Sequence, residues 1–486
     1  MTTATLTEPQ AAEAQAARRA KQLGFAVVIV ASVMDLLDST ITQTAAPAIR
    51  RSLGGSYADL EWLTAAYTLA MSATLILGSR FGDAFGRRQI LLAGMASFIL
   101  ASVLCALSPS IEVLIAARSL QGIAAAMMLP QGFGLIREMF GDEGQQQALG
   151  VFGPIMGMAA VLGPIVGGGL VNLNIVGTGW RAIFFVNVPL GAAAVVLGLR
   201  YLPNVGASHR GARFDPLSVV LAAVAGFGLV YPLIEGRQDG WPLWSFLMLA
   251  AGGLAVAAFS FRQASRVRHG HSPLVEPSIL RRRPYVAGLA VVLGFMGAMG
   301  GMMLAFNVMY QIGLGLSPLG CGVATVAVPL AAVPGSILSS ILLPKIGRTT
   351  MHLGLVTMTL GLIAVDLVMR SEGGTLTPWE LVAPLALTGF GMGQVFVPMF
   401  DVILAGVEPN QLGSASGLLE SVQQLAMSIG IAAVGTVLFD QLGRAFGPAA
   451  FVSAADHGLL VSLGMLVAAA LAVCWLPKHA RAGGGH

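Results

Sequence analysis

The sequence predicts an all-α polytopic membrane protein with fourteen transmembrane helices, arranged as six, two and six. Of its 486 residues, 56% are hydrophobic and 10% are charged, whereas soluble proteins carry about 25% charged residues. Apolar runs of about 20 residues, the length that crosses a bilayer, recur along the whole chain. A soluble fold is excluded because it needs more polar surface than this composition supplies.

The apolar runs define the predicted helices in chain order. They are 24–46, 60–78, 90–107, 111–135, 147–170, 182–200, 215–234, 242–261, 286–310, 319–343, 352–369, 380–404, 415–439 and 457–476. Longer polar stretches, 201–214 and 262–284, bracket the seventh and eighth. We therefore expect an N-terminal tail (1–23), a six-helix bundle (24–200), a linker with two further helices (201–284), a second six-helix bundle (285–476) and a C-terminal tail (477–486).

Basic residues alternate from loop to loop. With the N-terminus placed in the cytoplasm, 20 of the 27 Lys and Arg residues fall in cytoplasmic segments and six in external ones, with Arg118 inside the fourth helix. Cytoplasmic loops of membrane proteins are enriched in Lys and Arg. The bias predicts cytoplasmic termini and supports an even helix count. We expect the protein in the cell membrane, with the uncleaved first helix as its insertion signal.

A weak internal repeat points to a transporter. SRFGDAFGRR (79–88) follows the second helix, and SILLPKIGRT (340–349) follows the second helix of the later bundle. Both segments carry Gly-Arg at the same offset. Transporters are often built from such repeats, with the substrate site between the halves.

Two acids lie in the first predicted helix. Asp35 and Asp38 are spaced i, i+3 and share a helix face with Thr42. A central Asp costs about 2.5 to 3.5 kcal/mol on insertion, so each is a candidate functional residue. Neighbouring carboxyl groups titrate as a coupled pair, which suits proton coupling. The alternative is that both line a wet cavity or bond to neighbouring helices.

Two further residues are candidates for the same chemistry. Arg118 stays protonated and needs a partner inside the membrane, so we expect it to influence Asp38; the alternative is a structural ion pair. Glu420 lies about two turns into the thirteenth helix and is the best acid in the second half. The proton-coupling and substrate residues are therefore predicted as Asp35, Asp38, Arg118 and Glu420.

Three other acids have simpler interpretations. Asp366 and Asp401 lie near helix ends and are expected to reach an interface. Glu61 is expected to be a first-turn acid that is stabilised by the helix dipole.

The fifth helix contains Gly163, Pro164, Gly167 and Gly168. Proline bends a helix and glycines allow neighbouring helices to approach closely. We expect a kink and a smooth face here, and tight packing is the simplest interpretation.

Enzymatic chemistry is not expected. The three cysteines are far apart, and the motifs include no metal-ligand cluster, nucleophile elbow or phosphate loop. We expect no metal and no cofactor, and we expect a proton gradient to supply the driving force. The expected partners are a small lipophilic substrate, protons and the bilayer, with no nucleic acid and a functional monomer.

Several motifs resemble a known family. They are LDSTITQTAAP (37–47), SRFGDAFGRR (79–88), the RSLQG that begins at Arg118, GPIVGG (163–168), WRAIFFVNVPLG (180–191) and YQIGLGLSPLGCG (310–322). From 24 to 476 the chain resembles the major facilitator superfamily and, within it, the fourteen-helix drug:proton antiporters of the QacA/EmrB type. The Gly-Pro run is typical of antiport. The WRxxFxxNxPxG run and the inserted helix pair are typical of this branch.

The resemblance implies a transporter that alternates between inward-open and outward-open states. It implies that Asp38 responds to protons or substrate and that Arg118 takes part in proton coupling. Asp83, Gly86, Arg87 and Arg88 would belong to a cytoplasmic charge relay. Asp83 is expected to dock on the positive, N-terminal end of the thirteenth helix in the outward-open state.

Departures from the family pattern leave the substrate charge and proton stoichiometry open. They are Ser79, Gln43, Glu420, Gln423 and the additional acid Asp35. The expected function is proton-coupled export of drugs or toxic metabolites that are small, lipophilic and cationic. Met302, Met303 and Phe306 are candidate cavity walls, although helix packing is their simpler role. The alternatives are uptake of a polar solute with protons, which predicts more polar helices, and a non-transporting sensor, which leaves the intramembrane charges unused.

Overall fold

The computed structural model describes residues 8–173, 177–204, 215–236, 240–271, 273–404, 407, 411–443 and 447–476, and every regular element in them is helical. The first part of the chain holds α1 (Glu8–Leu53), α2 (Tyr57–Phe85), α3 (Arg87–Ala106), α4 (Ile111–Leu173), η2 (Gly179–Arg181), α5 (Ala182–Phe185) and α6 (Asn187–Tyr201). Next come α7 (Pro216–Glu235), α8 (Leu243–Arg268) and α9 (Pro277–Leu280). The last part holds α10 (Arg283–Val308), η3 (Met309–Gly313), α11 (Pro318–Thr325), α12 (Ala327–Ile346), α13 (Thr349–Glu372), η4 (Gly373–Thr375), η5 (Pro378–Leu381), α14 (Val382–Leu404), α15 (Leu412–Leu442) and α16 (Pro448–Val473).

Twelve helices of the described residues are long and apolar enough to cross a membrane. They coincide with twelve of the fourteen predicted spans. The predicted spans 147–170 and 380–404 correspond to the second part of α4 and to α14, which are not among the twelve. The chain is therefore an all-helical, multi-pass membrane protein.

Two helices differ from the prediction. α1 begins at Glu8, well before the expected start at 24, because the Ala-rich segment that we assigned to a polar tail favours a helix. α4 runs through both the fourth and fifth predicted spans, and its backbone leaves helical geometry at Gly141, with φ 70° and ψ −179°. The expected loop between these spans is thus reduced to a break that a glycine accommodates.

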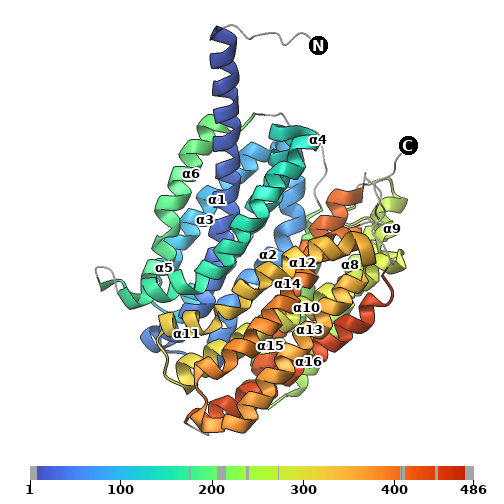
Figure 1. Cartoon of the computed structure of the whole chain (residues 1–486). Coiled ribbons are helices and arrows are strands. Elements are labelled where there is room, and N and C mark those ends of the chain that lie inside the picture. Colours follow the sequence, from blue (N-terminus) through green and yellow to red (C-terminus); the bar gives the residue numbers. More distant parts are fainter. Residues whose placement is uncertain are drawn as a thin grey trace.

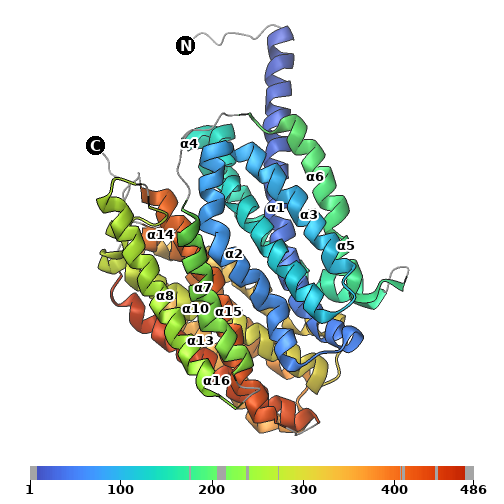
Figure 2. The same ribbon diagram turned by 180° about the vertical axis from the view of Figure 1, so that it is seen from behind.

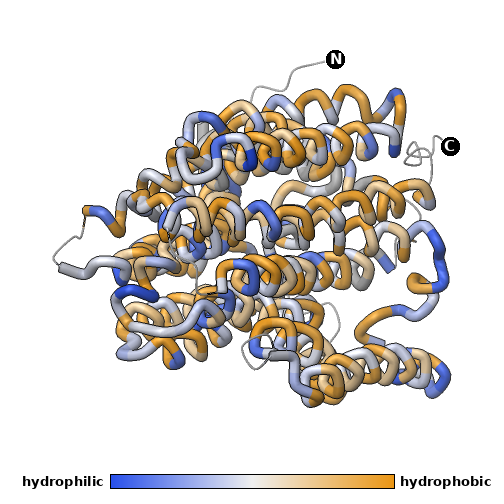
Figure 3. The backbone as a smooth tube through the Cα atoms, turned by 90° about the horizontal axis from the view of Figure 1, so that it is seen from below, coloured by the Kyte–Doolittle hydropathy of each residue, from blue (hydrophilic) through white to orange (hydrophobic). Residues whose placement is uncertain are grey.

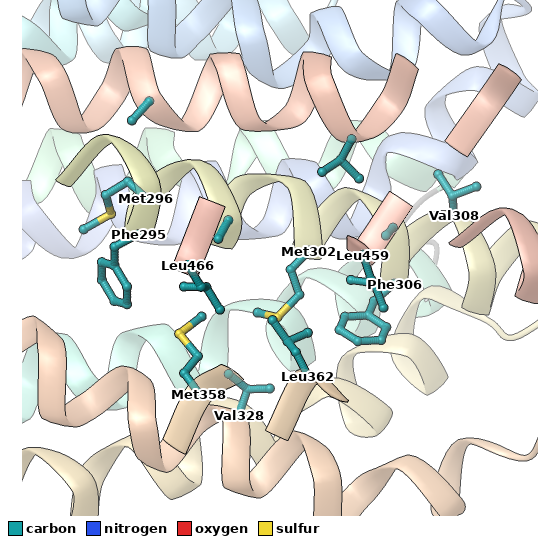
Figure 4. Close-up of a cluster of buried hydrophobic side chains, with 14 of the residues drawn as sticks. Phe295, Met296, Met302, Phe306, Val308, Val328, Met358, Leu362, Leu459 and Leu466 are labelled. Atoms are coloured by element: carbon teal, nitrogen blue, oxygen red, sulfur yellow. The ribbon is translucent and has the colours of Figure 1, made fainter. Parts of the chain in front are cut away.

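The helices form two bundles, α1–α6 and α10–α16, which lie side by side in Figure 1. A core that includes Met34 of α1 and Phe98 of α3 lies inside the first bundle. A larger core contains the Phe, Met and Leu side chains of the second bundle (Figure 4) and extends into the first bundle at residues such as Ile41 and Leu63. Met302 and Phe306 belong to that core and are buried in it, so the simpler interpretation of these two residues, helix packing, holds.

The outside of the molecule is apolar. Large side chains such as Phe261 and Leu254, each 71% exposed, project from the outer helices, and hydrophobic residues run along the helices on many sides (Figure 3). Soluble monomers rarely expose contiguous apolar surface of this kind. This surface faces lipid in a membrane protein.

The helix α7 touches both bundles, lying along α2 and α15 (Figure 2). The indole Nε1 of Trp62 on α2 donates to Glu235 Oε1 at 2.7 Å, and Thr436 Oγ1 on α15 donates to Leu233 O at 2.7 Å. α7 therefore contacts both halves of the molecule where they meet.

The opposite end of the α7–α8 pair is anchored by Asp215. This buried carboxylate accepts from Arg262 Nε at 2.9 Å and Nη2 at 2.7 Å, and lies 3.5 Å from Arg266 Nη1. Burial alone would raise the pKa of Asp215, but hydrogen bonds from Arg262 and Ser218 and the charges of Arg266 and Arg262 outweigh it and lower the pKa to about 2.

Candidate functional site

Asp38 is the centre of a polar cluster inside the first bundle. Its side chain on α1 is 2% exposed and forms an ion pair with Nη1 of Arg118 on α4. It also accepts from Gln121 Nε2 and Asn187 Nδ2, each at 2.8 Å. Three helices, α1, α4 and α6, thus meet at one carboxylate, whose negative charge is balanced by Arg118.

Arg118 is fully buried, and several groups replace its lost hydration. Nε donates to Leu63 O at 3.1 Å, and Nη1 donates to Gln121 Oε1 at 2.6 Å. The guanidinium carbon lies 4.3 Å from the centre of the Tyr67 ring, a cation–π contact. A buried charge is tolerated only with such compensation.

Sequence reasoning missed most of the cluster's neutral members. Gln121 follows Arg118 by three residues, so helical spacing alone places it on the same face. Asn187 belongs to the WRAIFFVNVPLG run, and Ser102 on α3 accepts from both amides, at 2.9 Å and 3.3 Å. Tyr67 had no signal beyond being a polar aromatic residue in an apolar span.

Asp35 lies one turn from Asp38, toward the predicted cytoplasmic end. The Tyr67 hydroxyl donates to its Oδ1, and the side chain is partly exposed. Among the described residues Asp35 has no ion-pair partner, in contrast to Asp38. The two acids of the first helix therefore differ. Asp38 is buried in an ion pair, whereas Asp35 is partly exposed.

Glu420 on α15 extends this group of acids to the second bundle. Its side chain is partly exposed and close enough to Asp35 for their charges to interact. Nearby, Ser72 Oγ on α2 donates to Ser421 O on α15 at 2.8 Å, which holds the two halves together at this level. The structure thus places Asp35 close to Asp38 and Arg118 in the first bundle and also close to Glu420 of the second bundle.

The predicted charge relay lies at the C-terminal end of α2 and the start of α3. Arg87 Nη2 is 3.2 Å from Asp83 Oδ1, and Arg87 Nε is 3.7 Å from Glu138 Oε1 on α4. Arg88 donates to Leu199 O on α6. Gly86 joins α2 to α3 with φ 99°, a conformation that L side chains rarely adopt. The docking of Asp83 on the thirteenth helix stays a prediction.

The Gly-Pro run of α4 packs on two helices. A Cβ on Gly167 would lie 2.9 Å from Ile41 Cγ2, and one on Gly163 would collide with Thr40, so α1 approaches closely. On the other side Gly168 faces the backbone of Leu319, and Pro164 O lies 2.5 Å from the position of a Cβ on Gly322 in α11. The run therefore packs α4 closely against α1 and α11. The backbone of α4 departs from helical geometry at Gly141, outside this run.

The remaining acids divide three ways. Glu61 is not in the first turn of its helix as predicted, because α2 begins at Tyr57. Its side chain is fully buried, and Gly435 of α15 leaves room for its carboxyl group. Asp366 is paired with Arg370 at 2.8 Å, and Arg370 also reaches Asp456 at 3.2 Å. The side chain of Asp401 lies outside the described residues.

The described residues hold no group of three or more His, Cys, Asp or Glu side chains that could bind a metal ion. A cavity of about 20 Å³, enough for one water molecule, lies between the halves, where Gln43, Thr64 and Asn307 are its polar lining residues.

Comparisons with known proteins agree with this architecture. The chain is 42% identical to a probable actinorhodin transporter of Streptomyces coelicolor, over 88% of this chain and 74% of that protein. It is 32% identical to a tetracenomycin C resistance and export protein of Streptomyces glaucescens (86% and 76%), and 30% identical to the multidrug resistance protein Stp of Mycobacterium tuberculosis (85% and 75%).

Solved structures share the fold. One of a proton-dependent oligopeptide transporter has a TM-score of 0.65 at 13% identity, covering 93% of this chain and 98% of that one. At that identity the likeness establishes the fold alone. The family model of the Major Facilitator Superfamily matches residues 28–431. The chain therefore belongs to the major facilitator superfamily, whose members are membrane transporters and not enzymes.

Proposed function

We propose that this protein is a drug:proton antiporter of the fourteen-helix, QacA/EmrB-type branch that exports small lipophilic, cationic compounds from the cytoplasm. The observation that carries the proposal is the line of charged groups from Arg118 and Asp38, through Asp35, to Glu420 on the opposite half. Export is supported by relatives whose names describe antibiotic export and multidrug resistance.

Different parts of the site have different tasks in this proposal. Asp38 is paired and receives two amide hydrogen bonds, so it fixes α1 against α4 and α6. Asp35 and Glu420 repel each other when both are ionised. A proton or a cationic substrate between them removes the repulsion, so the two ligands compete for one place. Such competition is what antiport requires.

Movement of the halves links this competition to transport. Asp35 belongs to the first bundle and Glu420 to the second, so rocking the bundles changes the separation of the two acids. Substrate binding then favours one state and proton binding the other. The proton gradient supplies the driving force without a cofactor. We place α7 and α8 as two additional transmembrane helices, with both termini in the cytoplasm of a monomer in the cell membrane.

Reconstituted transport tests the proposal. Purified protein in liposomes with an imposed pH gradient should exchange cationic lipophilic compounds for protons, and the wild-type rate should vanish when the gradient is collapsed. Accumulation of a polar solute together with protons would instead identify a symporter. Unchanged proton-driven transport by Asp38→Asn would contradict the assignment of the site.

Glu420→Gln separates substrate recognition from proton coupling. Loss of one of two neighbouring carboxylates weakens the attraction for a cation, so we expect the apparent affinity for cationic compounds to fall roughly ten-fold or more. Transport of neutral compounds of similar size should change much less. Equal losses for both classes would show that Glu420 does not select charge.

A further inference from the structure

A basic segment at the predicted cytoplasmic end contributes Arg282 to the lining of a cavity that the proposed transport mechanism does not use. Residues 262–284 contain six arginines and one acid, Glu276. Arg262 and Arg266 are held by Asp215. Six arginines against the two acids Glu276 and Asp215 leave this region positively charged.

Three of these arginines precede or begin α10 beside a cavity. The cavity, of about 330 Å³, is lined by Arg282, Pro284, Tyr285 and Ile403, which come from the start of α10 and the end of α14. Its volume is within the range of small-molecule sites. The Tyr285 hydroxyl donates to Ala415 O on α15 at 2.6 Å, and this bond fixes the aromatic wall.

The cavity has a firm inner boundary. A Cβ on Gly288 would lie 2.6 Å from Ile403 Cγ1, so α10 and α14 are in close contact one turn further in. Arg281 and Arg283 are exposed, and within the described part of the chain neither forms an ion pair with an acid. A ligand in the cavity therefore meets the Arg282 side chain beside the walls formed by Pro284, Tyr285 and Ile403, with Arg281 and Arg283 as its neighbours in sequence.

The face of α10 that carries Arg283 continues into lipid-facing surface. Arg283, Val286, Ala290 and Leu293 follow one another at helical spacing and are all exposed, Val286 by 44%. The apolar members of this stripe face the acyl chains, because the fold places α10 in a membrane. The guanidinium of Arg283 thus lies where the acyl region ends, at the level of lipid headgroups.

We propose that Arg281, Arg282 and Arg283, together with the cavity between α10 and α14, bind the phosphate headgroup of an anionic lipid. Basic pockets between transmembrane helices on the cytoplasmic side recognise such headgroups. The phosphate lies among the guanidinium groups, which favour bidentate contacts, and the glycerol portion lies against Pro284 and Tyr285. A general excess of basic residues in cytoplasmic loops accounts for the arginines, but not for a cavity that is lined by Arg282 together with aromatic and apolar side chains.

The test uses the full chain in detergent, titrated with phosphatidylglycerol or phosphatidylcholine while thermal unfolding is followed. A lipid that binds the native state raises the unfolding temperature in proportion to its occupancy. We expect stabilisation by phosphatidylglycerol alone. Each arginine near the surface contributes about a five-fold effect on affinity. Arg283→Gln should therefore weaken the apparent affinity about five-fold, and the Arg282→Gln/Arg283→Gln pair more than the single variant.

Matched controls decide between this site and general electrostatics. Lys345 is exposed at the end of α12, so Lys345→Gln removes the same charge at the same end of the molecule and should leave the affinity unchanged. Arg283→Lys should retain more affinity than Arg283→Gln. Displacement of spin-labelled phosphatidylglycerol from the wild-type protein gives a measurement that does not depend on how the variants fold.

Three results would overturn the proposal. One is an equal loss of affinity in Lys345→Gln, which indicates a diffuse charge effect. Another is equal stabilisation by phosphatidylcholine. The third is full competition by soluble glycerol phosphate, which indicates a site for free phosphate and not for a membrane lipid.

Discussion

At the scale of single residues, the pairing of Asp38 with Arg118 separates two acids that look equivalent in the sequence. Helical spacing placed Asp35 and Asp38 on one face, and Arg118 was expected to influence Asp38, but the pattern gave no information on the other groups that each acid meets. That depends on how α1 packs on α4 and α6, through contacts between residues far apart in the chain, such as Asp38 and Asn187. The candidate residues and the link between Arg118 and Asp38 were predictable, whereas the amide groups that bind Asp38 and the partial exposure of Asp35 were not.

The Asp38–Arg118 pair gives a prediction that single substitutions alone cannot settle. Removing one partner of a buried ion pair leaves an uncompensated charge, which costs about 3 to 5 kcal/mol. We expect Asp38→Asn and Arg118→Gln each to lower the unfolding free energy by an amount in that range. The double variant should lose less than the sum.

Thermal unfolding in detergent measures this coupling, and transport in liposomes shows its consequence. All three variants should lose proton-driven transport if the pair positions α1 for coupling. Normal transport by the double variant would show that the ion pair stabilises the fold but takes no part in proton coupling.

At the scale of the elements, the hydrophobic pattern was sufficient to locate the helices but not their ends. It placed α10, α13 and α15 close to their observed limits. It missed the continuation of α1 back to Glu8 and the helical turns on both sides of the break at Gly141 in α4, because Ala-rich and polar segments can extend a helix beyond the bilayer. Hydropathy locates the part of a helix that lies in lipid, whereas helix propensity determines how far the helix continues outside it.

The joint between α4 and α11 predicts opposite effects at adjacent glycines. Gly168 faces the backbone of Leu319, whereas a Cβ on Gly169 meets nothing within 4 Å. Gly168→Ala should destabilise the protein by about 1 to 3 kcal/mol through overpacking and slow transport. Gly169→Ala should be neutral or stabilising by up to about 1 kcal/mol, because alanine favours the helix.

Thermal unfolding and transport rates of the two variants check this directly. The same small side chain is added to neighbouring positions of one helix, so a difference between them reports the contact with α11. Equal effects would mean that the close approach has no energetic importance.

The anchor of the α7–α8 pair predicts a pH dependence. The pKa of Asp215 falls from 3.8 to about 2 in the folded protein, so the ionised form contributes stability above pH 3.8 that is lost as the pH falls to about 2. The difference in stability between wild type and Asp215→Asn should therefore be constant at neutral pH and shrink in acid.

Unfolding temperatures of the two proteins, measured side by side across this pH range, isolate the contribution of Asp215 from that of other carboxyl groups. Since Arg262 is partly exposed, the neutral-pH difference should be modest. A difference that stays constant down to pH 2 would show that the anchor does not depend on the ionised carboxylate.

At the scale of the whole molecule, two bundles and a helix pair between them follow from the count of apolar runs and from the basic residues of the loops. The contacts between the bundles do not follow from these patterns. Glu61 was expected in the first turn of its helix and is instead buried against Gly435, because the fit of α2 on α15 arises only when both bundles are assembled. Sequence periodicity describes one helix at a time and gives no information on its partner.

The bridging position of α7 has a consequence for how the gene can be divided. Because α7 bonds Trp62 on one half and Thr436 on the other, a second fragment that begins with α7 carries a binding surface for the first. Co-expression of residues 1–204 with residues 215–486 should give fragments that copurify. Starting the second fragment at residue 273, without α7 and α8, should weaken their association. The helix pair would then connect the two halves covalently through the chain and also non-covalently through the contacts of α7. A break in the polypeptide before α7 would therefore not separate the halves.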